Sequence, residues 1–561
     1  MRFLGLLFIF LLFNSCALVG IHFKVHNPNK AGKAIKYSDE TILLGELTEQ
    51  RTCYDVHYYD FSLTVDSDKK KLDGIVQIHA TAKTDFSALQ IDLHPNFEIT
   101  KLMDKTTQTA LNYTWNERAV FVEADHKKGD NFILEIAYNG KPEEAKKAPW
   151  KGGFVWKKDE AKYPWLGVAC ETDGASLWWP LKDHTSDEAD SVRMHYTVPK
   201  ELVAVGNGQL EGSTENGDYK TYNWFVSYPI NSYNVTIYVG KFRHFNETYK
   251  GINDKILQLD YYVLEPHYLM AKRHFEQVVP ILKAYEELFG EYPWYRDGFK
   301  LVESPYAGME HQSAIAYGQG YKNGYGSSTD YIILHETAHE WWGNSITVKD
   351  LADVWIQEGF ATYSEALYAE KEMGKEGYES TMLNQRIMIK NKYPVIGVKD
   401  RRCFHFRKNS DVYGKGSWIL HSLRCQMEDD SLFFDILKSF YGTYKYQIVE
   451  SKDFTDMVNA KTGEDYGWFF DQYLSSNFVP ELDYTYTDKG VVYYRWSNVP
   501  ANFNKLKIKI IANNKPYTLT PSVKTQHFDL PQNSRGEWQF EFEDMAVLFA
   551  LNENKGILKG K

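Results

Sequence analysis

The chain has few cysteines for its length. Its 561 residues include 5 cysteines, and no two of them form a CxxC pair, so a cysteine-ligated metal cluster is excluded. Four of the five are widely separated, namely Cys53, Cys170, Cys403 and Cys425. A chain of this size can build its cores without cross-links, so we expect most of the four to be buried free thiols. Export would also permit disulfides, but the spacing does not define their pairing.

Basic charge is not in excess either. The chain has 64 Lys and Arg against 75 Asp and Glu side chains, which gives a formal net charge of -11. A nucleic-acid-binding surface needs clustered positive charge, so we expect no nucleic-acid partner. Hydrophobic residues at 43% and charged residues at 25% are the usual balance of a folded protein, which excludes a mainly disordered chain. At roughly 150 residues per domain, the length predicts three to four domains.

Long hydrophobic runs are also lacking. The longest apolar stretch, Leu4–Phe13, is too short for the roughly 20 residues that cross a bilayer as a helix. Its place at the N-terminus is typical of the apolar region of a signal peptide. We therefore predict an exported protein whose signal segment covers residues 1–22, followed by a tether over residues 23–50.

Cys16 closely follows this apolar stretch. A cysteine after small or polar residues at the end of such a stretch resembles a bacterial lipoprotein processing site. This predicts a lipid on Cys16, membrane anchoring through it, and a periplasmic, outer-membrane or cell-surface location. The alternative is an ordinary secretory peptide cut near Ser15 or Ala17.

The spacing of apolar residues divides the rest of the chain into three parts. Alternation with period two, as at Leu63 and Val65, predicts strands over residues 51–242. Spacing of three and four residues then predicts a mainly helical domain over 243–478. Alternation returns over 479–561 and predicts a small terminal β domain. The fold class that follows is a multidomain α+β chain.

The residues that carry chemistry lie in the helical part. His335 and His339 are four residues apart, and Glu336 follows the first of them. At about 100 degrees per residue, a helix places all three side chains on one face. This is the HExxH pattern, in which two imidazoles bind zinc and the glutamate activates a water on the metal.

A third ligand is available farther along the chain. Eighteen residues separate His339 from Glu358, which lies in Trp355–Tyr363, a segment predicted to form the next helix. Two histidines, one glutamate and an open position for water form a catalytic zinc site. An HExxH sequence also arises by chance on a solvated helix, but a second glutamate at this spacing favours binding of one zinc ion per chain.

At this point the chain resembles the M1 family of gluzincin aminopeptidases, from about Tyr54 to Leu474. The family's HExxHxWxGN and WxxEGFA motifs are both present, beginning at His335 and Trp355. The resemblance implies an N-terminal β saddle domain, a thermolysin-like, mainly helical catalytic domain and a small C-terminal β-sandwich. It also implies that Glu336 is the general base.

The family has a Gly-Ala-Met-Glu-Asn segment, and residues 307–311 occupy its place as Ala-Gly-Met-Glu-His. Glu310 corresponds to the carboxylate that binds the substrate's free amine, and Gly308 is assigned to the substrate backbone. The first two residues are exchanged and His311 replaces Asn. A second amine contact is implied at Glu171, whose alternative is an ordinary loop acid.

Tyr413 matches the family tyrosine that stabilises the tetrahedral intermediate. A phenol has a pKa of about 10, so it can donate a hydrogen bond to the oxyanion near neutral pH. The resemblance therefore implies hydrolysis of the first peptide bond of peptides with a free N-terminus. Two alternatives remain, a thermolysin-like zinc endopeptidase and a non-catalytic peptide-binding surface protein.

Overall fold

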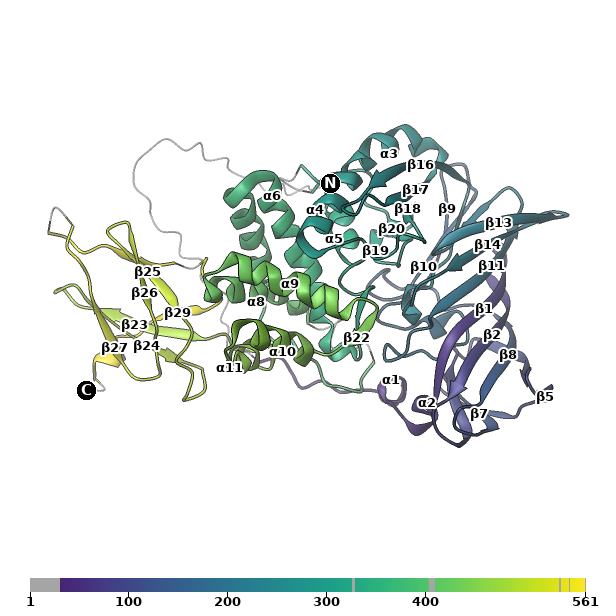
Figure 1. Ribbon diagram of the computed structural model, residues 1–561, viewed down its shortest axis with the longest axis horizontal. Helices are drawn as coiled ribbons and strands as arrows, with labels where there is room; N and C mark the ends of the chain where they lie inside the picture. The colour runs from purple at the N-terminus through teal and green to yellow at the C-terminus, as the bar shows by residue number, and fades with distance from the viewer. Residues whose placement is uncertain (1–30, 325–327, 403–408, 534–535, 544, 560–561) are drawn as a thin grey trace, which may run out of the picture.

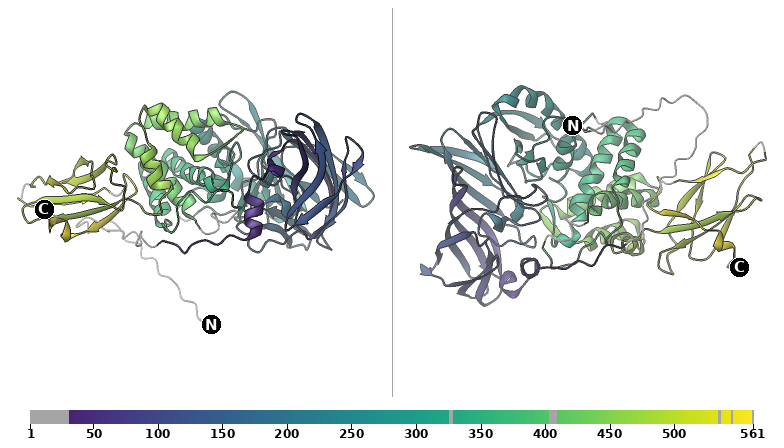
Figure 2. Two further views of the ribbon diagram at one scale, coloured as in Figure 1. Left: turned by 90° about the horizontal axis from the view of Figure 1, so that it is seen from below. Right: turned by 180° about the vertical axis from the view of Figure 1, so that it is seen from behind.

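The computed structural model describes residues 31–324, 328–402, 409–533, 536–543 and 545–559. These residues form three blocks along the long axis of the molecule (Figure 1). Strands build the N-terminal block, helices dominate the middle block, and a smaller set of strands builds the C-terminal block (Figures 1 and 2). The predicted fold class is confirmed. Cys16 and the signal segment 1–22 lie outside the described residues.

The largest sheet of the N-terminal block has eight strands in the order β13-β14-β11-β1-β2-β8-β4-β5. Their bounds are Tyr54–Asp66 (β1), Lys71–Ala82 (β2), Phe97–Asp104 (β4), Thr109–Ala110 (β5), Asn131–Gly140 (β8), Ser191–Pro199 (β11), Gln209–Asn216 (β13) and Tyr219–Val226 (β14). The alternating sequence turns one face of each strand inward. On β1, Phe61, Leu63 and Val65 are buried, whereas Ser62 and Thr64 between them are exposed.

Two smaller sheets complete this block, with the strand orders β12-β15-β10-β9 and β3-β7-β6. Their bounds are Phe86–Asp92 (β3), Tyr113–Asn116 (β6), Ala119–His126 (β7), Gly153–Lys158 (β9), Pro164–Ala169 (β10), Val203–Val205 (β12) and Tyr238–Gly240 (β15). Their buried residues share one hydrophobic core with the large sheet. Strand β10 ends two residues before Glu171 and so delivers that residue to the boundary with the middle block.

The predicted tether, residues 23–50, is in part folded. Its described part contains the short helix α1 (Asp39–Gly45), and α2 (Glu49–Thr52) follows at once. Arg51 on α2 is fully buried and forms an ion pair of 2.9 Å with Asp92, the last residue of β3 in the three-stranded sheet. The tether prediction is therefore wrong for α1 and α2, because a buried charged pair fixes this segment to the N-terminal block.

The middle block begins with a five-stranded sheet in the order β16-β17-β18-β20-β19. Its strands are Phe242–Lys250 (β16), Ile256–Leu264 (β17), Phe299–Glu303 (β18), Gly308–Met309 (β19) and Ile315–Tyr317 (β20). Strand β19 is at the edge and pairs antiparallel with β20. A short edge strand is open on one side, which is where an extended peptide can approach.

Helices form most of this block. They are α3 (Tyr268–His274), α4 (Val278–Phe289), α5 (Tyr331–Ala338), α6 (Trp355–Ile387), α8 (Asp411–Met427), α9 (Asp430–Tyr444), α10 (Ser451–Thr462) and α11 (Gly467–Leu474). A two-stranded ladder joins β21 (Ile346–Val348) to β22 (Gln447–Val449). The described residues also form short 3₁₀ turns: η1 (Ala175–Leu177) and η2 (Ser232–Asn234) in the N-terminal block, η3 (Glu265–His267), η4 (Phe275–Gln277) and η5 (Leu351–Asp353) in the middle block, and η6 (Lys555–Lys559) in the C-terminal block.

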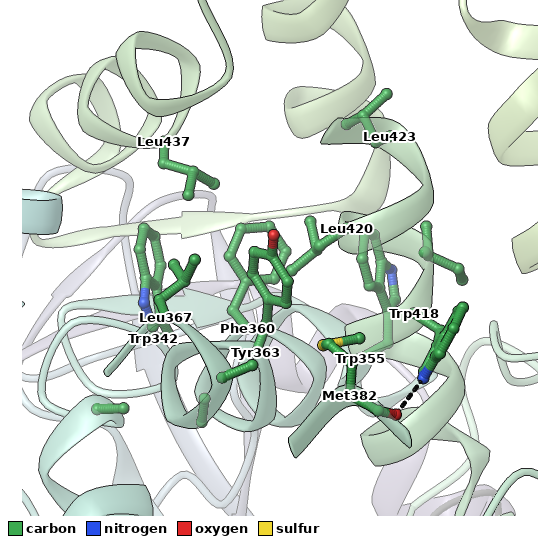
Figure 3. Close-up of a cluster of buried hydrophobic side chains, with 14 of the residues drawn as sticks. Trp342, Trp355, Phe360, Tyr363, Leu367, Met382, Trp418, Leu420, Leu423 and Leu437 are labelled. Carbon is green, nitrogen blue, oxygen red and sulfur yellow. Dashed lines mark hydrogen bonds between the residues drawn. The ribbon is translucent and has the colours of Figure 1, made fainter. Parts of the chain in front are cut away.

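Helices α6 and α8 approach each other closely. A methyl group on Gly359 of α6 would lie 2.9 Å from the Cα atom of Gly416 of α8, so a larger residue would push the helices apart. Buried aromatic and aliphatic side chains fill the space beside this contact (Figure 3). Among them, Trp418 donates a hydrogen bond of 2.8 Å to the Met382 carbonyl. This packing fixes the position of Glu358 relative to Tyr413, because the two helices carry one residue each.

The C-terminal block consists of two facing sheets, in the orders β27-β24-β23-β29 and β26-β25-β28. The strands are Glu481–Tyr486 (β23), Val491–Ser497 (β24), Ile508–Ala512 (β25), Lys515–Leu519 (β26), Gln526–Asp529 (β27), Phe540–Phe542 (β28) and Ala550–Glu553 (β29). The rings of Tyr484 and Phe542 meet across the sandwich at 5.2 Å. Within the described residues, no helix has the length and apolar character required to cross a membrane.

Candidate active site

Helix α5 presents the HExxH residues. Asp330 caps it, because its side chain accepts hydrogen bonds from the backbone N–H groups of Ile332 and Ile333. The helix ends at Ala338. His339 is the C-cap residue and keeps helical dihedral angles, and its N–H donates to the His335 carbonyl at 3.3 Å. Both imidazoles therefore point to the same side.

Three ligand atoms converge beside α5. The Nε2 atoms of His335 and His339 are 3.1 Å apart, and Oε2 of Glu358 lies 3.3 Å from the first and 3.4 Å from the second. Two ligand atoms that are each about 2.0–2.1 Å from a tetrahedral zinc ion lie roughly 3.3–3.4 Å from each other. The three separations between the ligand atoms of His335, His339 and Glu358 are close to this value, and all three side chains are buried. The set therefore fits Zn²⁺.

Hydrogen bonds to the far nitrogen atoms orient the two imidazoles. Nδ1 of His335 donates to Oε1 of Glu365 at 2.8 Å, and Nδ1 of His339 donates to the Trp342 carbonyl at 2.8 Å. A proton held at Nδ1 leaves the lone pair of Nε2 for a metal. Sequence reasoning missed Glu365. It follows Glu358 by seven residues, which is two helical turns, and that spacing on α6 could have indicated it.

Glu336 lies next to the ligand set. Its carboxylate oxygen is within 4.8 Å of the ligand atoms of His339 and Glu310. Burial raises the pKa of Glu336 to about 8, with His335 and His339 opposing the effect and Glu310 adding to it. A carboxyl group whose pKa lies near neutrality can both accept and return a proton.

Two more carboxylates border the same space. Glu310 directly follows β19, and Glu171 follows β10 of the N-terminal block. One oxygen atom from each of Glu171, Glu310 and Glu358 lies within 4.8 Å of the others. Burial raises the pKa of Glu310, with Glu358 adding to the effect and His339 opposing it. A cation placed among these carboxylates would relieve their mutual repulsion.

Tyr413 is on the first turn of α8. Its ring lies 6.1 Å from the ring of His335, measured between centroids. Burial raises the pKa of Tyr413 well above 10, and Glu358 and Glu171 add to this effect. The phenol therefore keeps its proton and serves as a hydrogen-bond donor beside the ligand set.

A cavity of about 410 Å³ connects these residues. Its lining includes every site residue predicted from the described part of the sequence: Glu171, Gly308, Glu310, His335, Glu336, His339, Glu358 and Tyr413. Exposed apolar side chains of Trp150, Ile387 and Met388 also line it. The sequence did not indicate these three residues, because no local motif marks them.

His311, which replaces Asn in the family segment, is fully buried. The phenol of Tyr238 donates to the Ala314 carbonyl at 2.8 Å, so Nδ1 of His311 is the donor in its 2.6 Å contact with the Tyr238 oxygen. Burial lowers the pKa of His311 to about 3, which keeps the ring neutral. His311 therefore anchors the segment that carries Glu310 from behind.

The chain is similar to curated aminopeptidases. The chain is 23% identical over 385 residues to "Probable aminopeptidase 2" of Sulfurisphaera tokodaii, a match that covers 64% of this chain and 46% of that protein. It is 21% identical over 411 residues to "Leucyl aminopeptidase" of Saccharolobus solfataricus, covering 69% of this chain and 50% of that protein. The chain thus spans about half the length of the curated relatives it matches.

Solved structures show the same fold. The M1 zinc metallopeptidase of Deinococcus radiodurans superimposes with a TM-score of 0.64 at 21% identity, over 76% of this chain and 96% of that one. A mutant of it bound to a Tyr-Ser-Ala substrate gives a TM-score of 0.63 at 22% identity, with the same coverage.

Two family models match the chain. The Peptidase M1 N-terminal domain matches residues 56–233, and the Peptidase family M1 domain matches residues 273–473. Together these segments span more than half of the sequence. The chain therefore belongs to peptidase family M1.

Proposed function

We propose that this protein is a zinc-dependent aminopeptidase that removes the first residue from peptides with a free N-terminus. The observation that carries the proposal is the pair of buried carboxylates, Glu310 and Glu171, beside the ligand set. A free α-amine has a pKa of about 8 and is largely cationic at neutral pH. Carboxylates at this place favour a terminal ammonium and disfavour the neutral amide of an internal residue.

The anchors also set which bond is cleaved. When the ammonium lies between Glu310 and Glu171, the carbonyl of the first residue lies one residue away, at the ligand set. Gly308 lies on the edge strand β19, and an extended peptide backbone can run along such an edge. The bond presented for hydrolysis is therefore the first one.

The reaction needs an activated water, a polarised carbonyl and a protonated leaving group. His335, His339 and Glu358 would hold a zinc ion, which would polarise the carbonyl as a Lewis acid and lower the pKa of the attacking water. Glu336 accepts the proton that this water loses and passes it to the nitrogen of the departing amine. Tyr413 donates a hydrogen bond to the oxygen on which negative charge develops.

Stepwise release tests this function. The purified, zinc-loaded chain is incubated with a decapeptide of defined sequence, and the products are followed by mass spectrometry. The proposal expects ladders that shorten from the N-terminus one residue at a time. Internal fragments would show that the protein is a thermolysin-like endopeptidase instead. An unchanged peptide would favour the non-catalytic peptide-binding protein.

We further propose that the protein is exported and held on a membrane by a lipid on Cys16. The support is the apolar N-terminal stretch followed by Cys16. Changing Cys16 to Ala should move the protein from the membrane fraction to the soluble fraction. If mass spectrometry finds the wild-type chain unacylated and the chain is already soluble, this location is wrong.

A further inference from the structure

A turn of the N-terminal block reaches into the middle block. It consists of Asn231, Ser232, Tyr233 and Asn234, and we call it the interdomain turn. Asn231 caps it, because the side chain accepts a hydrogen bond from the N–H of Asn234. Asn231, Tyr233 and Asn234 are 0% exposed. Side chains of this kind are buried only where each polar group finds a partner, and here those partners lie around the active site.

Tyr233 directly contacts Glu310, the carboxylate proposed to bind the substrate amine, and we call Glu310 the amine anchor. Its phenol oxygen accepts a hydrogen bond of 2.8 Å from Nε2 of Gln357, the residue before the ligand Glu358. The phenol proton is then directed to Oε1 of Glu310, at 3.2 Å. Burial raises the pKa of Tyr233 well above 10, with Glu310 and Glu171 adding to the effect, so the phenol remains a donor.

Asn234 supports the backbone of the same anchor. Its Nδ2 donates to Oδ1 of Asn344 at 2.6 Å, and its Oδ1 accepts from the N–H of Gln312 at 3.3 Å. Nδ2 of Asn344 in turn donates to the Glu310 carbonyl at 2.7 Å. The interdomain turn therefore acts on both ends of Glu310, on its carboxylate through Tyr233 and on its backbone through Asn344.

We propose that Tyr233 is a positioning residue for amine recognition. It holds the Glu310 carboxylate in the direction of the substrate ammonium, so that recognition of the first residue depends on the N-terminal domain. This inference rests on the proposed aminopeptidase function. Tyr233 contacts Glu310 but is not among the residues that line the cavity, so it acts through Glu310 and not on the substrate itself.

Electrostatic repulsion is the reason that such a hydrogen bond matters. Oxygen atoms of Glu171, Glu310 and Glu358 lie within 4.8 Å of one another. Without a fixed donor, the Glu310 carboxylate would rotate away from its neighbours and from the site that the ammonium occupies. A donor with a fixed geometry removes this freedom before the substrate binds.

The test compares Tyr233→Phe with the wild type as full-length, zinc-loaded proteins. The substrates are a leucyl fluorogenic amide with a free amine and its N-acetylated form. Because a hydrogen bond to a buried charge is lost, KM for the free-amine substrate should rise about ten- to a hundredfold. kcat should stay within about threefold, and zinc content should not change. The preference for the free amine over the acetylated substrate should narrow.

Tyr138→Phe is the matched control. Tyr138 is also a buried tyrosine of the N-terminal block, and its phenol donates to the Trp178 carbonyl at 3.2 Å, away from the cavity. This variant should leave KM and the preference for the free amine unchanged. Gln357→Leu is a second test variant, because it removes the hydrogen bond that directs the phenol, and KM should rise in the same direction.

A double-mutant cycle with Glu310→Ala decides between positioning and a general loss of structure. If Tyr233 acts through Glu310, Tyr233→Phe should change KM little when Glu310 is already Ala. Equal losses in both backgrounds, or a fall in kcat together with loss of zinc, would overturn the proposal. Failure of the aminopeptidase function gives a different result, because the wild type itself would then cleave the acetylated substrate as well as the free one.

Discussion

Gly308 lies directly against Glu336. A methyl group on Gly308 would be 2.5 Å from Oε1 of Glu336 and 2.8 Å from Cγ2 of Ile332. The family segment places a glycine before an alanine, whereas this chain has Ala307 before Gly308. In this chain the glycine is the residue in contact with Glu336, the carboxylate proposed as the base, and the contact leaves no room for a side chain.

Gly308→Ala should displace the Glu336 carboxylate without unfolding the chain. A misplacement of about 1 Å at a catalytic group costs roughly a hundredfold in rate, so kcat/KM should fall by about that factor. Zinc content should be unchanged. Gly442→Ala on α9 is the control, because a methyl group there meets nothing within 4 Å. Full activity of Gly308→Ala would show that catalysis does not require the Glu336 carboxylate to lie against residue 308.

Glu336 and Glu358 should separate catalysis from metal binding. Glu336→Gln keeps the shape of the side chain but cannot accept a proton, so turnover should fall by about a hundredfold or more while zinc stays bound. Glu358→Ala removes one of the three described ligands and should lose zinc as well as activity. Zinc per chain is measured for both after dialysis. Equal zinc loss in the two variants would contradict this division of roles.

Glu365 should control zinc affinity through His335. Replacing it with Gln weakens the hydrogen bond that holds the proton on Nδ1 of His335, which is 2.8 Å long. Loss of such a partner typically lowers metal affinity about 10- to 100-fold. Competition with a chelator measures the change. Glu370→Gln is the control on the same helix, since Glu370 pairs with Arg424 instead. An unchanged zinc affinity in Glu365→Gln would show that Glu365 does not orient His335 for zinc binding.

The parts of the site that the sequence predicted lie within short motifs. His335, Glu336 and His339 lie on or cap one helix, and Glu358 begins the next, so local spacing suffices to predict that they converge. Glu171 could be predicted only from the resemblance to the M1 family, because its approach to the ligand set depends on how two domains pack.

Tyr233 and Trp150 could not be predicted from local sequence motifs. Each comes from the N-terminal block and reaches the site only through the packing of that block against the middle block. Helix α1 was missed for a different reason. Ser38 caps it and Asp39 and Glu40 occupy its first turn, which is a helix-start signal, but seven residues are too few for a clear apolar period.

The stability of the N-terminal block should depend on pH through His184. This side chain is buried and bonds Ser186 Oγ through Nδ1 at 2.8 Å and the Gly45 carbonyl through Nε2 at 3.2 Å. Burial lowers the pKa of His184 to about 3, and Arg51 and Arg402 add to the effect. In the unfolded chain the pKa of histidine is about 6.5.

Between these two pKa values the unfolded chain binds more protons than the folded chain. The free energy of unfolding should therefore rise with pH over this range and fall on acidification, by up to about 1.4 kcal/mol per pH unit from this one group. Urea unfolding at pH 7 and pH 5 measures the slope. His184→Gln should show a shallower slope than the wild type, and identical slopes would mean that His184 is not buried in the neutral form.

The central claim is that a terminal ammonium, bound by Glu310 with Glu171, directs the enzyme to the first peptide bond. The most direct measurement is kcat/KM for one peptide with a free and with an acetylated N-terminus, for the wild type and for Glu310→Ala at equal zinc content. Acetylation removes the cation that the buried carboxylates would bind, which costs about 2–5 kcal/mol, so the wild type should prefer the free peptide by about thirtyfold to several thousandfold. Glu310→Ala should lose activity on the free peptide and narrow this ratio. Efficient cleavage of the acetylated peptide at internal bonds by the wild type would contradict the account and assign an endopeptidase.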